Sequence, residues 1–213
     1  MNRPKVKICG IKEIKTIDVC IYNEIEYFGL VFYKNSPRNL SLDHALKLIN
    51  YVISKDIIPV GVFVNKSIQD LKDIIKQTNL KHIQLHGNED SDYINLLKKK
   101  FEVKIIKSVG IKNKDDFDKI KKVLNADYFL FDYKPEISEL PGGNARKFNW
   151  SLFKNVKISK PYFISGGINV NNVGEIKKIK IPYGIDISSG VEEKLGIKNN
   201  KKITKLLEMF NAQ

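Results

Sequence analysis

The feature that most constrains the fold is a regular alternation, along the whole chain, of short apolar runs and amphipathic segments. Eight runs rich in β-branched and aromatic residues have the length of strands, and they cover residues 5–9, 27–32, 57–64, 82–85, 103–108, 127–131, 162–165 and 183–187. One run occurs about every 27 residues, which is the length of a βα unit with short loops. Their nearly continuous apolar character indicates strands that are buried on both faces, as in a parallel sheet.

The segments between these runs have the periodicity of helices. Within residues 41–53 the apolar side chains recur at the spacing of one buried helix face, namely Leu42, Ala45, Leu46, Ile49, Val52 and Ile53. Ser67 and Asp70 have the spacing of a helix start, where such side chains accept hydrogen bonds from free amide groups. Residues 115–124 and 201–210 have the same apolar stripe with lysines opposite it. Helices are therefore expected between the strands.

Eight βα units predict an α/β fold, a single (β/α)8 TIM barrel domain with eight parallel strands over residues 1–213. The alternative is an open doubly wound sheet, which usually has fewer strands and a G-x-G-x-x-G motif in its first turn. The first turn here reads "CGIKEI" and lacks that motif. No change in composition, low-complexity linker or near-identical repeat divides the chain, so the barrel is favoured.

The composition excludes several classes of protein. The N-terminus is charged and no apolar stretch approaches the roughly 18 residues of a membrane span, so we expect a cytoplasmic protein without a signal peptide or membrane partner. Cys9 and Cys20 form no CxxC pair, and we expect both thiols to be reduced. The three histidines are scattered and lack metal-ligand spacing to the cysteines, so we expect no metal site.

The formal net charge of +13 raises the hypothesis of a protein that binds nucleic acid. Only three of the 37 basic residues are arginine, however, and arginine is the residue that reads base edges through its planar fork. The lysines fall mostly on outward helix positions, where they are solvated. We therefore expect no nucleic-acid partner, and we keep a lysine-driven RNA or DNA binder as an alternative. A basic surface can also steer a small anionic substrate towards its site.

In a barrel of this kind the active site is built from the loops at the carboxyl ends of the strands. Cys9 closes the first run, Asp132 directly follows the sixth, and Lys107 and Ser108 end the fifth. The other polar and glycine residues at these ends are Ser36, Pro37, Arg38, Asn65, His86, Gly166, Gly167, Ser188, Ser189 and Gly190. The sequence therefore predicts that these residues converge on one rim.

Two of these ends have the character of a phosphate site. In "ISGGINVNNV" a strand runs into two glycines and an Asn-rich helix start, and glycines let the backbone approach a ligand closely. "DISSGVE" offers a second group of amides and hydroxyls after the eighth run. The loops after strands seven and eight are the usual phosphate site of a (β/α)8 barrel. Together they predict a ligand that carries phosphate.

The sequence motifs at the strand ends, taken together, resemble those of one protein family. "KICGIK", "GLVFYKNSPR", "GVFVN", "IQLHGNE", "LFD", "PGG…FNW", "ISGGINVNNV" and "GIDISSGVE" together resemble the phosphoribosylanthranilate isomerase family of tryptophan biosynthesis. The resemblance extends over essentially the whole chain, in order, at every strand end except the fifth. It implies a (β/α)8 barrel that catalyses an Amadori rearrangement, with Cys9 as the base and Asp132 as the acid. It implies no metal or organic cofactor.

The resemblance also implies which residues bind the phosphorylated small-molecule substrate. Arg38, one of only three arginines, is the candidate to grip the anthranilate carboxylate bidentately. His86 is a candidate to orient the substrate or the loop after the fourth strand, and a structural hydrogen bond is its alternative role. The other candidate substrate-binding residues are Gly143, Gly166, Gly167, Asp186, Ser188, Ser189 and Gly190. Cys20 and Asp127 are expected to be structural.

One stretch departs from the family pattern. The family usually reads Gly-Gly-Thr-Gly and then Phe-Asp-Trp after the sixth strand, whereas this chain has Asn144, Ala145 and Asn149 in place of the threonine, last glycine and aspartate. Asn149 can still cap the next helix, but alanine visits positive φ less freely than glycine. We expect activity with altered loop motion. A barrel that binds a phosphate ligand without catalysis and another sugar-phosphate isomerase are the alternatives, and the protein is expected to be a monomer or a homodimer.

Overall fold

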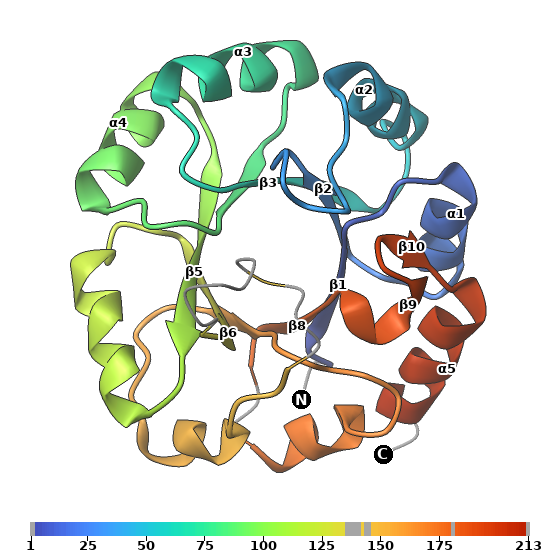
Figure 1. Ribbon diagram of the computed structural model, residues 1–213, viewed down its shortest axis with the longest axis vertical. Helices are drawn as coiled ribbons and strands as arrows, with labels where there is room; N and C mark the ends of the chain where they lie inside the picture. The colour runs from blue at the N-terminus through green and yellow to red at the C-terminus, as the bar shows by residue number, and fades with distance from the viewer. Residues whose placement is uncertain (1–2, 135–141, 143–145, 180–181, 212–213) are drawn as a thin grey trace.

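The computed structural model describes residues 3–134, 142, 146–179 and 182–211, and in them eight parallel strands close a barrel. Each strand pairs with the next one along the chain, and the eighth returns to pair with the first. Figure 1 looks along the barrel and shows the helices as an outer ring around the strands. The predicted (β/α)8 barrel is thereby confirmed.

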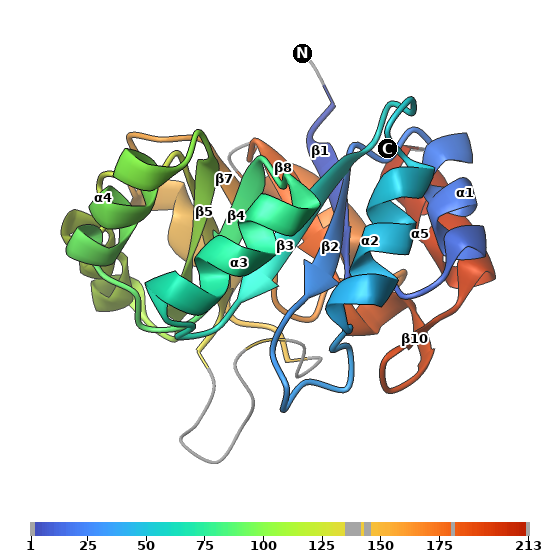
Figure 2. The same ribbon diagram turned by 90° about the horizontal axis from the view of Figure 1, so that it is seen from above.

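The strands of the barrel agree closely with the predicted apolar runs. They are β1 (Lys5–Cys9), β2 (Tyr27–Val31), β3 (Ile58–Phe63), β4 (His82–Leu85), β5 (Lys104–Ile111), β6 (Tyr128–Tyr133), β7 (Tyr162–Ile164) and β8 (Gly184–Ile187). A two-stranded hairpin, β9 (Glu192–Lys194) and β10 (Ile197–Lys198), follows β8. Figure 2 shows this hairpin projecting from the lower edge of the molecule.

Strands β5 and β6 are longer than the sequence predicted, because their backbones stay paired as far as Ile111 and Tyr133. Asp132 therefore lies inside β6, and the prediction that it follows the strand was wrong. Lys107 and Ser108 lie in the middle of β5, so the prediction that they end it was also wrong. In β6 the strand continues past its apolar run into Asp132, where hydropathy no longer marks a strand, whereas β5 continues through Val109 and Ile111, which the predicted run left out.

The helices differ between the two halves of the chain. The first half has four α-helices, α1 (Ile14–Tyr22), α2 (Leu42–Tyr51), α3 (Ile68–Thr78) and α4 (Ser91–Lys100). The second half has 3₁₀ helices, η1 (Lys114–Lys122), η2 (Trp150–Asn155), η3 (Val173–Lys178) and η4 (Ser189–Val191), before the final α5 (Asn200–Asn211). None of the helices in the described parts of the chain combines the length and the hydropathy that a bilayer crossing requires.

The predicted helix starts are present. The side chain of Ser67 accepts a hydrogen bond from the amide of Asp70, at 3.1 Å, and so caps α3. Asn149 caps η2 in the same way, through the amide of Ser151 at 3.0 Å. The helix over residues 41–53 is shorter than its pattern suggested, because α2 ends two residues before Ile53. That side chain is 78% exposed, so its assignment to the buried face was wrong.

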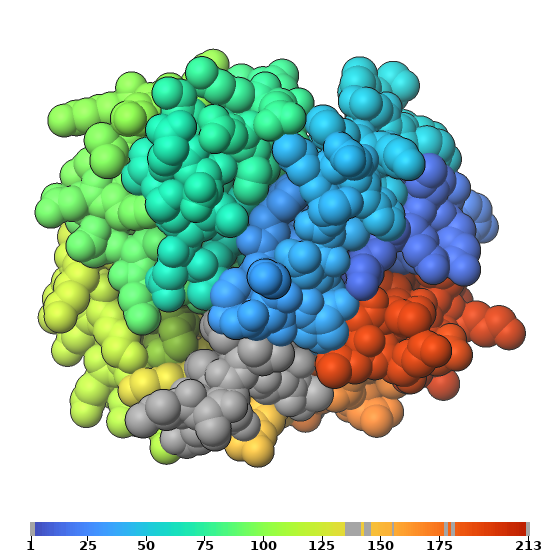
Figure 3. All heavy atoms as spheres, turned by 45° about the horizontal axis from the view of Figure 1, so that its top comes forward, coloured from blue at the N-terminus to red at the C-terminus, as the bar shows by residue number. Residues whose placement is uncertain are grey.

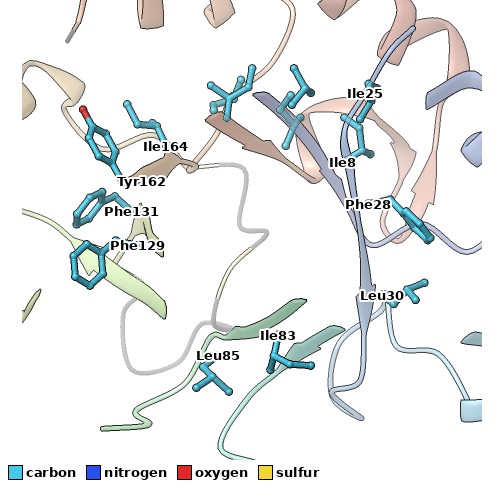
Figure 4. Close-up of a cluster of buried hydrophobic side chains, with 14 of the residues drawn as sticks. Ile8, Ile25, Phe28, Leu30, Ile83, Leu85, Phe129, Phe131, Tyr162 and Ile164 are labelled. Carbon is cyan, nitrogen blue, oxygen red and sulfur yellow. The ribbon is translucent and has the colours of Figure 1, made fainter. Parts of the chain in front are cut away.

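The main hydrophobic core lies between the outer face of the barrel and the ring of helices. Figure 4 shows side chains such as Ile8, Phe28 and Ile83 directed outward from the strands. Cys20 belongs to this core and is fully buried, as predicted. Because neighbouring side chains on a strand point to opposite faces, the residues before and after Ile8 face the barrel interior. Those residues are Lys7 and Cys9.

The two ends of the described chain meet in the ring of helices. The hydroxyl of Thr16 in α1 lies 3.0 Å from the side-chain oxygen of Asn200 in α5. In Figure 3 the C-terminal region, in red, lies directly beside the N-terminal region, in blue. This contact places the β9–β10 hairpin, which precedes α5, next to the carboxyl end of β1.

Candidate active site

One continuous cleft opens at the carboxyl ends of the strands. One part of it is lined by residues from β1, β2, β4, β6 and β8 and the loops behind them, including Cys9, Arg38, His86, Asp132 and Asp186. A second part is lined by the segments 165–168 and 188–190, and it shares Asp132 and Asp186 with the first. The structure thus brings together in this cleft the described residues that were predicted to be catalytic or to bind the substrate. Gly143, Asn144 and Ala145 lie outside the described residues.

Cys9 lies at the last position of β1, with 8% of its surface exposed to the cleft. Its sulfur has room because the facing residue of β2 is Gly29. A β-carbon at that position would lie 2.7 Å from Cys9 Sγ and 3.2 Å from Lys7 Nζ. Burial raises the pKa of the Cys9 thiol above its usual range, and the ammonium group of Lys7 opposes that rise.

Lys7 is fully buried in the barrel, and its Nζ donates a hydrogen bond to Asp186 Oδ1 at 2.9 Å. Burial alone would lower the pKa of Lys7. The carboxylate of Asp186 and the neighbouring Cys9 outweigh that effect and raise this pKa instead. The side chain is therefore a charged ammonium group held directly below the floor of the cleft.

Asp132 faces the same cleft from β6, and each of its carboxylate oxygens has a neighbour. Oδ1 accepts a hydrogen bond from the backbone amide of Tyr133 at 2.8 Å, and Oδ2 lies 3.4 Å from His86 Nε2. The amide nitrogen of Gln84 lies 2.8 Å from His86 Nδ1. With Gln84 donating to Nδ1, the imidazole proton is on Nε2 and faces Asp132. His86 thus contacts the carboxyl group to which the family resemblance gives the role of the acid.

Arg38 lines the cleft from the loop after β2, but one edge of its guanidinium is already paired. Its Nε and Nη2 each donate to a carboxylate oxygen of Glu192, both at 2.8 Å. Burial alone would raise the pKa of Glu192, but Arg38 and Lys198 outweigh it and hold that pKa below its usual range. A substrate carboxylate would therefore have to use another edge of the guanidinium.

Lys198 of the hairpin completes this buried group of charges. Its Nζ lies 2.8 Å from Glu192 Oε1 and 3.1 Å from the carbonyl oxygen of Ser188. Burial lowers the pKa of Lys198, although Glu192 opposes this shift. Ser188 in turn donates its hydroxyl to the carbonyl oxygen of Cys9 at 3.0 Å. The hairpin, the loop after β8 and the end of β1 are thus joined through polar contacts.

The second part of the cleft is formed by the glycine-containing loops that the sequence predicts to bind phosphate. Gly166 and Gly167 both have positive φ, 82° and 66°. A β-carbon on Gly190 would lie only 1.8 Å from the carbonyl oxygen of Ile168, so the loops after β7 and β8 touch where only glycine fits. The Asn-rich stretch after the glycines holds the turn, since Asn172 Nδ2 donates to the carbonyl oxygen of Gly167 at 2.9 Å.

Several residues at the site were not identified from the sequence. Gly29, Glu192 and Lys198 were not singled out, although Glu192 stands in the quoted motif "GIDISSGVE". Lys107 donates to the carboxylate of Glu89 at 3.0 Å, and it lines a neighbouring opening at the rim together with Asn65, His86 and Asp132. There it anchors the loop after β4. No group of histidine, cysteine and acidic side chains in the described parts of the chain is arranged to hold a metal ion.

Comparison with known proteins agrees with this geometry. The sequence profile of the N-(5′-phosphoribosyl)anthranilate (PRA) isomerase family matches residues 6–209. The chain is 37% identical over 204 residues to N-(5′-phosphoribosyl)anthranilate isomerase of Thermoanaerobacter pseudethanolicus, with 96% of each chain covered. It is similar in structure to the phosphoribosylanthranilate isomerase of Thermotoga maritima, with a TM-score of 0.87, 28% identity and coverage of 99% and 100% of the two chains.

A further solved relative carries a ligand. It is a phosphoribosylanthranilate isomerase in complex with reduced 1-(o-carboxyphenylamino)-1-deoxyribulose 5-phosphate, and it matches this chain with a TM-score of 0.81 and 26% identity over 99% of this chain and 100% of the relative. The family match spans almost the whole barrel, including both parts of the cleft. The chain belongs to the N-(5′-phosphoribosyl)anthranilate isomerase family.

Proposed function

We propose that this protein isomerises N-(5′-phosphoribosyl)anthranilate to 1-(2-carboxyphenylamino)-1-deoxyribulose 5-phosphate, a step of tryptophan biosynthesis. The observation that carries the proposal is a single cleft in which a thiol and a carboxyl group share one chamber and glycine loops form the next. An aldose-to-ketose rearrangement needs one acid and one base beside adjacent carbon atoms, with the phosphate held away from them.

The two parts of the cleft suit the two ends of the substrate. The phosphate would lie on the loops of Gly166, Gly167 and Ser188–Gly190, where the backbone can approach it closely. The anthranilate carboxylate would lie towards Arg38, whose position is fixed by Glu192. The ribose would then lie between Cys9 and Asp132, which line the shared middle of the cleft.

In the first step the Asp132 carboxyl group donates its proton to the ring oxygen of the ribose. The bond between that oxygen and C1′ breaks, and the anthranilate nitrogen forms a Schiff base with C1′. The contact of Asp132 with His86 and with the amide of Tyr133 fixes the direction of the carboxyl group for this transfer. Asp132 is left as a carboxylate.

In the second step the Cys9 thiolate removes the proton from C2′. The electron pair of that C–H bond moves to form the C1′–C2′ double bond, and the Schiff base becomes an enolamine. Tautomerisation of the enolamine gives the ketone. Cys9 can remove this proton only when its sulfur is a thiolate. The charged groups around Cys9 therefore take part in the mechanism, because they affect its pKa.

The test is a fluorescence assay in which the purified protein consumes the substrate and its anthranilate fluorescence is lost. Cys9→Ser and Asp132→Asn are each expected to lower turnover by at least ~10²-fold, the usual contribution of an acid–base group. Cys20→Ser is the matched control, since Cys20 is buried in the outer core and faces no ligand. Tight binding of a product analogue without turnover would support a binding barrel instead. Wild-type rates in both variants would contradict the assigned roles.

A further inference from the structure

The most unusual charge in the barrel is the fully buried ammonium group of Lys7. A lysine without solvent exposure is costly, because its charge loses the hydration that it has in water. Asp186 compensates this charge from β8, at 2.9 Å. The mechanism above uses neither residue in a chemical step, and replacing such a pair with apolar residues is often neutral or stabilising. A purely structural role therefore explains the pair poorly.

The position of Lys7 beside Cys9 explains why a buried charge is present here. Lys7 and Cys9 are two residues apart on β1, so both side chains face the barrel interior. The missing side chain of Gly29 leaves a space whose walls include Cys9 Sγ and Lys7 Nζ, at 2.7 and 3.2 Å from the β-carbon that glycine lacks. The Cys9 sulfur and the Lys7 ammonium group therefore lie close together, on either side of the space beside Gly29.

We propose that Lys7, held in place by Asp186, is a positioning residue that stabilises the thiolate form of Cys9, and that Asp186 competes with the thiolate for the same ammonium group. The proposal rests on the role of Cys9 as the base. Lys7 lies below the cleft and is absent from its lining, so it would act through Cys9 rather than through the substrate.

Other charged groups also lie near Cys9. From the hairpin, Lys198 also favours the thiolate, whereas Asp186 from β8 disfavours it. Arg38 and Glu192 pair with each other on the same side of the cleft, and Asp132 and His86 line its other side. Among the described residues on the Cys9 side, the three cations Lys7, Arg38 and Lys198 face the two carboxylates Asp186 and Glu192. Of these cations, Lys7 is the one that shares the space beside Gly29 with the Cys9 sulfur.

Substitutions of Lys7 and Asp186 should shift the pKa of the Cys9 thiol in opposite directions. Removing the ammonium group leaves the thiolate without its nearest cation, so Lys7→Met should raise the thiol pKa. Removing the competing carboxylate leaves Lys7 with the thiolate as its closest anion, so Asp186→Asn should lower the thiol pKa. A residue pair that only holds the barrel together would move the thiol in the same direction in both variants, through looser packing.

The experiment measures the rate of alkylation of Cys9 by iodoacetamide against pH, in a Cys20→Ala background and without substrate. Because the thiolate is the reacting form, the pH at which the alkylation rate rises reports the pKa of the thiol. Loss of an adjacent opposite charge shifts a pKa by about one unit or more, so the profile of Lys7→Met should move up by about one pH unit and its rate at neutral pH should fall about threefold. Asp186→Asn should react faster than the background protein. Lys5→Met is the control, because Lys5 lies on the same strand with a 45% exposed side chain.

The same variants are then followed by the pH profile of kcat/KM. The alkaline shift of the base in Lys7→Met should match the shift of the thiol in the alkylation measurement. An unchanged alkylation profile in folded Lys7→Met, or shifts of the same sign in both variants, would overturn the proposal. If Lys7→Met does not fold, slower alkylation of Asp186→Asn overturns it alone. Since alkylation needs no substrate, failure of the proposed isomerase activity would leave this result unaffected.

Discussion

The two ends of the barrel interior are filled with opposite kinds of side chain. The end where the strands begin holds a cluster of rings, in which Phe163 lies edge-on to Tyr27 and Tyr183 at centroid distances of 5.7 and 5.3 Å. The end where the strands finish holds buried ion pairs, Lys7 with Asp186 and Arg38 with Glu192. We call these the aromatic end and the charged end. The same eight strands support both.

The difference shows where the fold obtains its stability and where it keeps its chemistry. Packed rings gain free energy from burial and from edge-to-face contact without any ligand. Buried ion pairs lose hydration energy that their attraction only roughly repays, so they are weak evidence for stability. The charged end is therefore expected to be retained for catalysis and binding. Substitutions at the aromatic end should therefore lower stability, and substitutions at the charged end should also affect catalysis or binding.

The first prediction removes the central ring of the aromatic end. Phe163→Ala should lower the free energy of unfolding by about 3–5 kcal/mol, because it leaves a cavity in a region where the side chain is almost fully buried. The kcat and KM of the folded protein should stay close to wild type. Urea unfolding followed by fluorescence, together with the activity assay at low temperature, measures both quantities.

Leu195→Ala is the control for this variant, since Leu195 is 68% exposed on the hairpin. Its free energy of unfolding should change by less than about 0.5 kcal/mol. A marked fall in kcat of folded Phe163→Ala would contradict the comparison, because it would mean that the aromatic end takes part in catalysis.

The second prediction neutralises the charge shared by two cations at the charged end. In Glu192→Gln the guanidinium of Arg38 and the ammonium of Lys198 lose their common carboxylate. A hydrogen bond to a charged group contributes about 1.5–3 kcal/mol to stability, so the free energy of unfolding should fall by about 2 kcal/mol. In contrast to the first variant, KM should also rise, by about tenfold, because Arg38 is no longer held in position.

Glu193→Gln is the matched control, since Glu193 is the next residue along and is exposed. Substrate titrations of both variants separate KM from kcat. A Glu192→Gln protein that loses stability but keeps the wild-type KM would assign this carboxylate to folding alone, and the contrast between the two ends would then be weaker than we propose.

Much of this architecture could be predicted from the sequence, because strands buried on both faces are marked by their apolar composition. The order of eight runs gave the barrel, and the barrel placed Cys9 and His86 on one rim. The end of β6 was placed too early because the strand continues from its apolar run into Asp132. Backbone pairing continued there although hydropathy had stopped reporting it.

The residues that surround Cys9 could not be identified from the sequence. Lys198 lies on a hairpin far along the chain from Cys9, and nothing in a lysine-rich sequence distinguishes it from the exposed lysines. Gly29 contributes by lacking a side chain, which matters only when its neighbours in space are known. Such contacts depend on the register between strands, which the hydrophobic pattern and the geometry of the turns set together, so the pattern of one strand alone does not identify them.

The last and smallest prediction concerns the hydroxyl groups of the aromatic end. Tyr27 and Tyr183 share a hydrogen bond of 2.7 Å, so Tyr27→Phe should cost about 1 kcal/mol of unfolding free energy at neutral pH. Burial, with Tyr183 adding to it, raises the pKa of Tyr27 well above its usual range. The folded state therefore favours the neutral phenol. Stability is fully present below the unfolded pKa of about 10 and is lost as the pH rises through and beyond that value.

Tyr27→Phe removes one of these phenols, so its unfolding free energy should fall less steeply above pH 10 than that of the wild type. Some slope should remain, because the pKa of Tyr128 is also raised by burial and by Tyr183. Tyr22→Phe is the control, since Tyr22 is 84% exposed and should leave the curve unchanged. Urea titrations between pH 7 and 11 give the comparison. If the alkaline slope of Tyr27→Phe equalled that of the wild type, the aromatic end would owe its stability to ring packing alone, without a contribution from its hydroxyl groups.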